Sequence, residues 1–134
     1  MRVKQLASKH LKSIGVAAKK NELGLIFTFE GWDFLLWDDA EDPLFFRLVL
    51  PGVFDVTDEN FAEAIMACNK VNWNFKVVKA VLCEFEDKHD NGASVWMCFE
   101  KRLDDSPQID ELIPHAARSL IAAADAFDKE MMEG

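Results

Sequence analysis

Three short runs of apolar and aromatic residues, divided by turn signals, follow one another in the first half of the chain. Runs of this length that are rich in branched and aromatic side chains are typical of β-strands. Gly31 predicts a tight turn after the first run, and Pro51-Gly52 predicts the end of the third. We therefore expect three consecutive strands, at Leu25–Glu30, Trp32–Asp38 and Leu44–Leu50.

The segments before and after these strands have helical periodicity. Apolar residues recur at steps of three and four from Val3 to Ala18, and cations occupy the opposite face of this first helix. A second helix is expected after Thr57, which can cap it and which acidic residues follow. Its expected buried face contains Phe61, Ala64, Ile65, Cys68 and Val71.

The second half of the chain predicts a long hairpin followed by a helix. Phe75–Glu86 and Val95–Lys101 are the expected strands, and Asn91-Gly92 is a strong signal for the turn between them. Ser106-Pro107 can cap and begin the last helix. Since proline removes a helical hydrogen bond, Pro114 either lies close to the first turn or kinks this helix.

Together these elements predict a single α+β domain that covers residues 1–134. The order is helix, three strands, helix, two strands, helix, which favours a mainly antiparallel five-stranded sheet. Half of the 134 residues are hydrophobic, enough for one buried core without disulfides or metals.

The formal net charge of −9 argues against nucleic acids as partners, and the apolar pattern argues against a membrane span. Cations bind the phosphates of nucleic acids, so we expect no nucleic-acid partner. No apolar run approaches the roughly 20 residues that span a bilayer, and the N-terminus lacks the features of a secretory signal. We therefore expect a cytoplasmic protein without a membrane contact.

The charge is divided unevenly along the chain. Residues 1–20 contain six bases and no acid, whereas the remaining residues contain nine bases and 24 acids. We favour the interpretation that the first helix packs its apolar face on the sheet and keeps its cations in water. The alternatives are that these cations complement the acidic body of the same chain or of a second subunit, or that they bind an external partner.

The expected strands are apolar on both faces, as in Leu25-Ile26-Phe27 and Leu44-Phe45-Phe46. A half-exposed sheet shows alternation instead. Monomers rarely expose apolar patches beyond a few hundred Å², and most soluble oligomers are symmetric dimers. We therefore expect a homodimer.

No motif predicts a metal site or a cofactor. The spacing of Cys68, Cys83 and Cys98 does not suit a metal, so we interpret them as reduced thiols. The loop Glu86–Gly92 fits a calcium loop at only three positions, and helices do not flank it. We interpret this loop and the acidic stretch Asp38–Asp42 as solvated turns.

Nothing in the sequence predicts catalysis. No nucleophile or carboxylate lies at a spacing from His10 or His115 that defines a triad, and a glycine-rich phosphate loop is absent. The four tryptophans and eleven phenylalanines suit core and interface packing better than base stacking, because the sheet region is acidic. We expect that the protein is not an enzyme.

The element order, length and acidity resemble the type III secretion chaperone-like fold, a group that includes the specialised export chaperones and the YbjN-type bacterial proteins. The resemblance extends from Val3 to about Met131 and rests on no diagnostic motif. It implies a small, acidic, cytoplasmic homodimer without catalytic activity. Export chaperones hold an extended effector segment in apolar grooves, so the resemblance implies a partner-binding or dimer surface among Phe27, Phe29, Phe34, Trp37, Phe45 and Phe46.

We predict a non-enzymatic domain that binds a protein or peptide client. The alternative is a regulatory domain that binds a small molecule or a metal. It predicts either a closed pocket or a cation held by Glu86, Asp87, His89 and Asp90.

Overall fold

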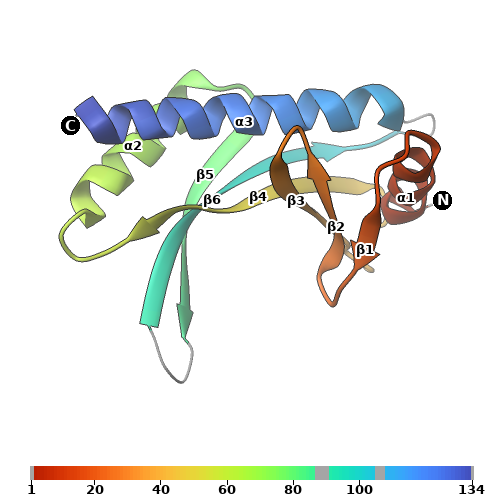
Figure 1. Cartoon of the computed structure of the whole chain (residues 1–134), viewed down its shortest axis with the longest axis horizontal. Coiled ribbons are helices and arrows are strands. Elements are labelled where there is room, and N and C mark those ends of the chain that lie inside the picture. Colours follow the sequence, from red (N-terminus) through yellow and green to blue (C-terminus); the bar gives the residue numbers. More distant parts are fainter. Residues whose placement is uncertain (1, 87–90, 105–107, 134) are drawn as a thin grey trace.

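Six antiparallel strands form one sheet in the computed structural model, and three helices pack on one face of it (Figure 1). The structure describes residues 2–86, 91–104 and 108–133. The helices are α1 (Val3–Ser13), α2 (Phe61–Asn74) and α3 (Ile109–Glu133). The strands are β1 (Ala18–Lys20), β2 (Gly24–Phe29), β3 (Trp32–Trp37), β4 (Phe45–Val56), β5 (Val78–Glu86) and β6 (Asn91–Arg102). This confirms the α+β class and the antiparallel sheet that the sequence predicts.

The sixth strand, β1, replaces the expected last turn of the first helix. The helix ends at Ser13, because Gly15 adopts a positive φ of 78° that closes it. The backbone N–H of Gly15 donates to the Lys12 carbonyl, and that of Val16 donates to the Leu11 carbonyl, as in a Schellman motif. The chain then turns back, and β1 pairs with β2 at one edge of the sheet.

The strands lie in the order β1-β2-β3-β4-β6-β5, so β4 joins the first three strands to the C-terminal hairpin. The sequence predicts that β4 ends at Leu50, but the strand continues to Val56. The pairing with β6 shifts between Leu50 and Phe54, where Pro51-Gly52 forms an irregularity and Gly52 has a φ of 62°. The expected turn Asn91-Gly92 is part of β6 in the structure, and residues 87–90 lie outside the described residues.

Helix α3 is the main cover of the sheet. It has 25 residues and a length of about 37 Å, and it runs along the sheet between α1 at one end and α2 at the other (Figure 1). Pro114 lies inside it, near its start, while the expected cap Ser106-Pro107 lies outside the described residues. Small side chains let α3 approach the strands closely. Its buried stripe is Ile109, Ile113, Ala116, Ala117, Leu120, Ala123, Ala124 and Phe127.

Helix α2 packs on β5 and α3 and begins four residues after Thr57. The Asn60 side chain accepts a hydrogen bond from the Thr57 N–H, so Thr57 lies in the turn before the helix and does not cap it. Further along α2, the Asn72 side chain both donates to the carbonyl and accepts from the N–H of Ala80, at 3.1 and 2.6 Å. These two bonds tie α2 to the edge strand β5 and satisfy backbone groups that an unpaired edge leaves free.

Candidate functional site

The sheet face opposite the helices, here called the open face, has no described helix over it (Figure 1). One row of directly paired residues crosses four strands on this face: Ile26, Leu35, Val49 and Cys98. Their alternate neighbours along each strand face the helices and form the main core. Both faces of the central strands are therefore apolar, as the sequence indicates.

Two tryptophans enlarge this row into an apolar patch. Leu35, Val49 and Cys98 form a small cluster of their own, and Trp37 of β3 and Trp96 of β6 pack against it while remaining partly exposed. The Trp96 indole N–H donates to the Ser94 hydroxyl at 2.8 Å. Ile26 is 40% exposed. Leu35, Val49 and Cys98 are buried, so Ile26 and the two tryptophans provide the accessible surface. The open-face patch is defined as Ile26, Leu35, Trp37, Val49, Trp96 and Cys98.

Charged side chains border the open-face patch. Glu100 lies within 2.7 Å of both the Arg47 Nε and the Lys79 Nζ. The Arg47 guanidinium also lies 5.9 Å from the ring centre of Trp37 and 5.3 Å from that of Phe45, within the range of cation–π contacts. These contacts hold the rings and the charges in one arrangement on the sheet surface.

The pKa of Glu100 reflects this arrangement. Partial burial raises it, but the hydrogen bonds from Lys79 and Arg47 and their positive charges outweigh burial, so the pKa lies below its ordinary value. A carboxyl group whose pKa is lowered on folding stabilises the fold above its unfolded pKa of about 4.3, and this contribution is lost as the pH falls through the folded value.

We therefore expect Glu100→Gln to lower the free energy of unfolding by about 1 kcal/mol at neutral pH, and by less at pH values near 3. Urea unfolding across this pH range measures the difference. Glu22→Gln, at an exposed glutamate with no ion pair among the described residues, is the control and should follow the wild type. Equal pH dependence in the Glu100 variant and the wild type would contradict the role of the ion pairs.

The three cysteines are free thiols. Burial raises the pKa of each of them, Cys68, Cys83 and Cys98, so the protonated and unreactive form prevails at neutral pH. Cys83 is paired with Ser94 and Cys98 with Lys79, so the two cysteines of the hairpin are not directly opposite each other.

The aromatic residues expected to form a surface divide between the two faces of the sheet. Phe27, Phe34 and Phe46 face the helices and are at most 2% exposed, so they belong to the core and form no accessible surface. Phe29 is partly buried on the same side, and the Arg118 guanidinium lies 5.7 Å from its ring centre. Trp37 and Phe45 are partly exposed on the open face.

Sequence reasoning missed Ile26 and Trp96 as members of this surface. The signal for both is strand alternation. Side chains two residues apart on a strand lie on the same face of the sheet, so one assigned residue on a strand assigns the others. The sequence does not say which face of each strand the helices cover, so alternation alone does not identify Ile26 and Trp96.

Helix α2 carries a second apolar surface, which we call the α2 outer surface: Phe61, Ile65, Met66 and Trp73. Phe61 and Ile65 were expected on the buried face of this helix, but both are exposed, and Ala64, Ala67, Cys68 and Val71 form its buried face instead. Met66 is 60% exposed and Trp73 is 88% exposed. A hollow of about 240 Å³ beside Met66 is lined by Ala62, Glu63, Ala67, Lys70 and Glu130.

The described residues contain no cluster of histidine, cysteine and carboxylate side chains suited to a metal ion. Of the expected cation ligands, Asp87, His89 and Asp90 lie outside the described residues, as does the side chain of Glu86. His10 and His115 lie on different helices, α1 and α3, and His115 packs edge-on against Phe99. Among the described helices, none combines the length and the apolar character that crossing a membrane requires.

A search of solved structures finds a similar fold. The chain superposes on the crystal structure of YbjN, described as "a putative transcription regulator from E. coli", with a TM-score of 0.64. The match covers 95% of this chain and 92% of that one, at 12% sequence identity. The chain therefore has a YbjN-type fold, as the element order predicts. No protein-family model and no curated protein matches the sequence.

Proposed function

We propose that residues 1–134 form a single, non-enzymatic, cytoplasmic domain that dimerises and binds an extended segment of a client protein on its open face. The observation that carries this proposal is the open-face patch, because two tryptophans and an isoleucine present apolar surface there with no described element over them. Apolar surface bordered by polar residues marks a site of protein interaction. Tryptophan and arginine, which meet at Trp37 and Arg47, are the residues most enriched at binding hot spots.

An extended peptide suits the open face better than a nucleic acid does. The patch is flanked by a carboxylate as well as by cations, and the whole chain has a net charge of −9. YbjN, a solved structure with this fold, is called a transcription regulator only provisionally, and a regulator can act by binding another protein. Because this chain is acidic, a regulatory role would be exerted through a protein partner and not through direct binding of DNA.

The α2 outer surface supports the dimer. We expect a second copy of the chain to cover this surface. In a two-fold dimer both copies use the same patch, so the apolar residues of one α2 would pack against those of the other. This leaves the open faces of both copies available for the client.

The experiment selects peptides from a displayed random library on immobilised wild-type protein and measures their affinity in solution. We expect apolar peptides that shift the tryptophan fluorescence and lose at least about tenfold in affinity against Ile26→Lys. The matched control is Ile14→Lys, since Ile14 is also a half-exposed isoleucine, at 50%, but lies at the end of α1 away from the open face. Peptides that bind both variants equally, or a library that yields no binder, would overturn the proposed site.

A further inference from the structure

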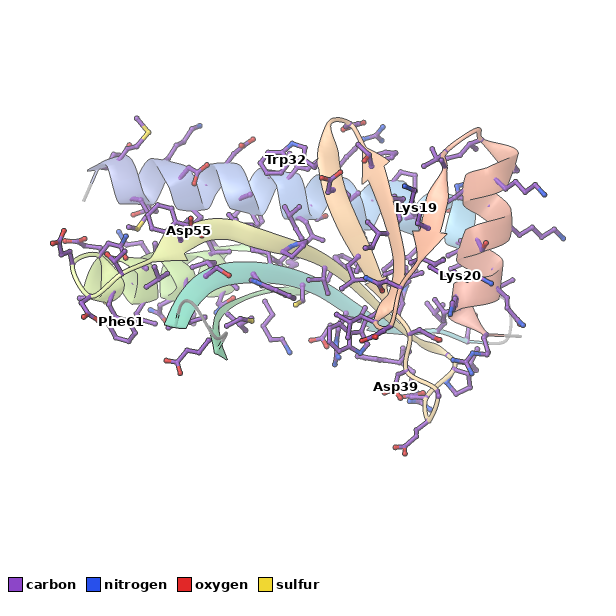
Figure 2. The ribbon with its side chains drawn as sticks, turned by 60° about the horizontal axis from the view of Figure 1, so that its bottom comes forward. Lys19, Lys20, Trp32, Asp39, Asp55 and Phe61 are labelled. Carbon is purple, nitrogen blue, oxygen red and sulfur yellow. The ribbon has the colours of Figure 1, made fainter. Side chains whose placement is uncertain are left out.

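A basic hollow lies between α1 and the adjoining edge of the sheet. It has a volume of about 740 Å³, and α1 supplies most of its wall. Figure 2 shows Lys20 beside α1, at the side of the hollow that β1 forms. The basic hollow is lined by Arg2, Lys4, Gln5, Ser8, Lys9, Lys12, Lys20, Asp38 and Ala40.

A single carboxylate, that of Asp38, pairs with two cations of this hollow. Asp38 pairs with the Arg2 guanidinium, and its second oxygen lies 3.5 Å from the Lys4 Nζ. The hydrogen bond from Arg2, opposed by partial burial, holds the pKa of Asp38 below its ordinary value, so this carboxylate is charged at neutral pH. Asp38 thereby holds Arg2 and Lys4 in place in the lining of the hollow.

The other three cations, Lys9, Lys12 and Lys20, have no carboxylate within 4 Å among the described residues. The lining thus contains five cations and a single carboxylate, in a chain whose overall charge is −9. Cations that share one hollow concentrate positive potential there, and a cleft lined by one sign of charge attracts ligands of the opposite charge. The apolar face of α1, with Val3, Ala7 and Leu11, is buried, so the hollow is independent of the packing that holds α1 in place.

Asp38, which lines the hollow, directly follows Trp37 of the open-face patch along the chain. The rest of the hollow lies on the helical side of the sheet, because α1 packs there and Lys20 pairs with the core residue Leu25. We infer that the basic hollow binds an acidic segment of the client protein, which passes around the β1 edge of the sheet from the apolar segment on the open face. This inference rests on the proposed function, and it names the chemistry that a client must have: carboxylates beside apolar residues.

A carboxylate-rich peptide fits this hollow better than other polyanions do. The lining contains no aromatic ring on which a base could stack. A duplex carries a charge every 1.7 Å or so and extends past any hollow of this size. It would therefore meet the carboxylate of Asp39, which precedes Ala40 in the acidic loop (Figure 2). A membrane would need exposed apolar residues along α1, but those of its apolar face are buried.

The test measures the binding of a fluorescein-labelled octaglutamate peptide by anisotropy at low salt. Wild type should bind it, and the triple variant Lys9→Glu, Lys12→Glu, Lys20→Glu should bind at least about tenfold more weakly. The matched control, Lys76→Glu, Lys101→Glu, Lys129→Glu, makes the same change of charge at exposed lysines outside the hollow, and should remain within about twofold of wild type. Circular dichroism checks that both variants are folded.

Three results would overturn the inference: no binding of octaglutamate to wild type, equal weakening in both triple variants, or stronger competition by a DNA duplex, pyrophosphate or anionic vesicles than by unlabelled octaglutamate. The proposed function fails by a different result, because the apolar peptides selected on the open face require no acidic residues. Octaglutamate binding that the Ile26→Lys variant retains would show that the hollow acts apart from the open face.

Discussion

Phe46→Ala is expected to lower the free energy of unfolding by about 3–5 kcal/mol, the usual cost of removing a phenylalanine ring from a packed core. Phe46 is fully buried, and its ring packs edge-on against Phe99, with ring centres 6.2 Å apart. Truncation removes these contacts and leaves a cavity under the helices that the rigid sheet cannot fill. Equilibrium unfolding in urea measures the loss.

Phe45→Ala is the matched control, since the same change is made one residue earlier on the opposite face of the same strand. Phe45 is partly exposed and its ring contacts the Arg47 guanidinium, so we expect a loss of about 1 kcal/mol. If Phe46→Ala does not fold, Phe46→Leu, which keeps most of the apolar volume, should cost about 1–2 kcal/mol. Equal losses for the Phe45 and Phe46 variants would contradict the assignment of the two faces.

This pair of neighbours also shows what the sequence alone could establish. The runs around Phe45 and Phe46 predict strands because of their composition, and the order of helices and strands predicts the α+β fold. Which residue of each pair meets the helices depends on the side from which α3 crosses the sheet. Both faces are apolar, so the strand alternation that normally distinguishes them is weak here.

The end of the first helix had a local signal that the periodicity obscured. Gly15 lies within a segment whose apolar residues continue at helical spacing to Ala18. Glycine at the end of a helix adopts a positive φ without strain, and the backbone bonds to Leu11 and Lys12 follow from it. The glycine signal therefore places the end of the helix near Ser13, and the residues after it form β1.

The sequence predicts part of the surface on the open face but not the α2 outer surface. Trp37 and Phe45 are among the surface residues that the resemblance to the export chaperones implies. The α2 outer surface was not expected, since helical periodicity places Phe61 and Ile65 near the same face as Ala64 and Cys68. The tight packing of the small residues of α2 on β5 and α3 turns the larger ones toward solvent.

Met66→Asp and Trp73→Asp are each expected to convert the proposed dimer to a monomer. Both residues lie on one side of α2, two helical turns apart, so both would be covered when α2 packs against the α2 of a second copy. A carboxylate buried there without a partner costs several kcal/mol, which corresponds to a loss of about 100-fold or more in dimer affinity. Sedimentation equilibrium of each variant and of the wild type gives the dissociation constants.

Met132→Asp is the matched control, because Met132 is 85% exposed but lies near the end of α3 and outside the α2 outer surface. It should dimerise as the wild type does. The exposure of Met66 and Trp73 in the single chain means that their replacement leaves the core intact, so thermal unfolding of the monomeric variants should remain cooperative. A monomeric wild type at micromolar concentration, or an equal effect of all three substitutions, would contradict dimerisation through α2. Helix α2 lies on the helical side of the sheet, so the dimer contact and the client site should be separate surfaces. Monomeric Met66 and Trp73 variants should therefore still bind the peptides selected on the open face.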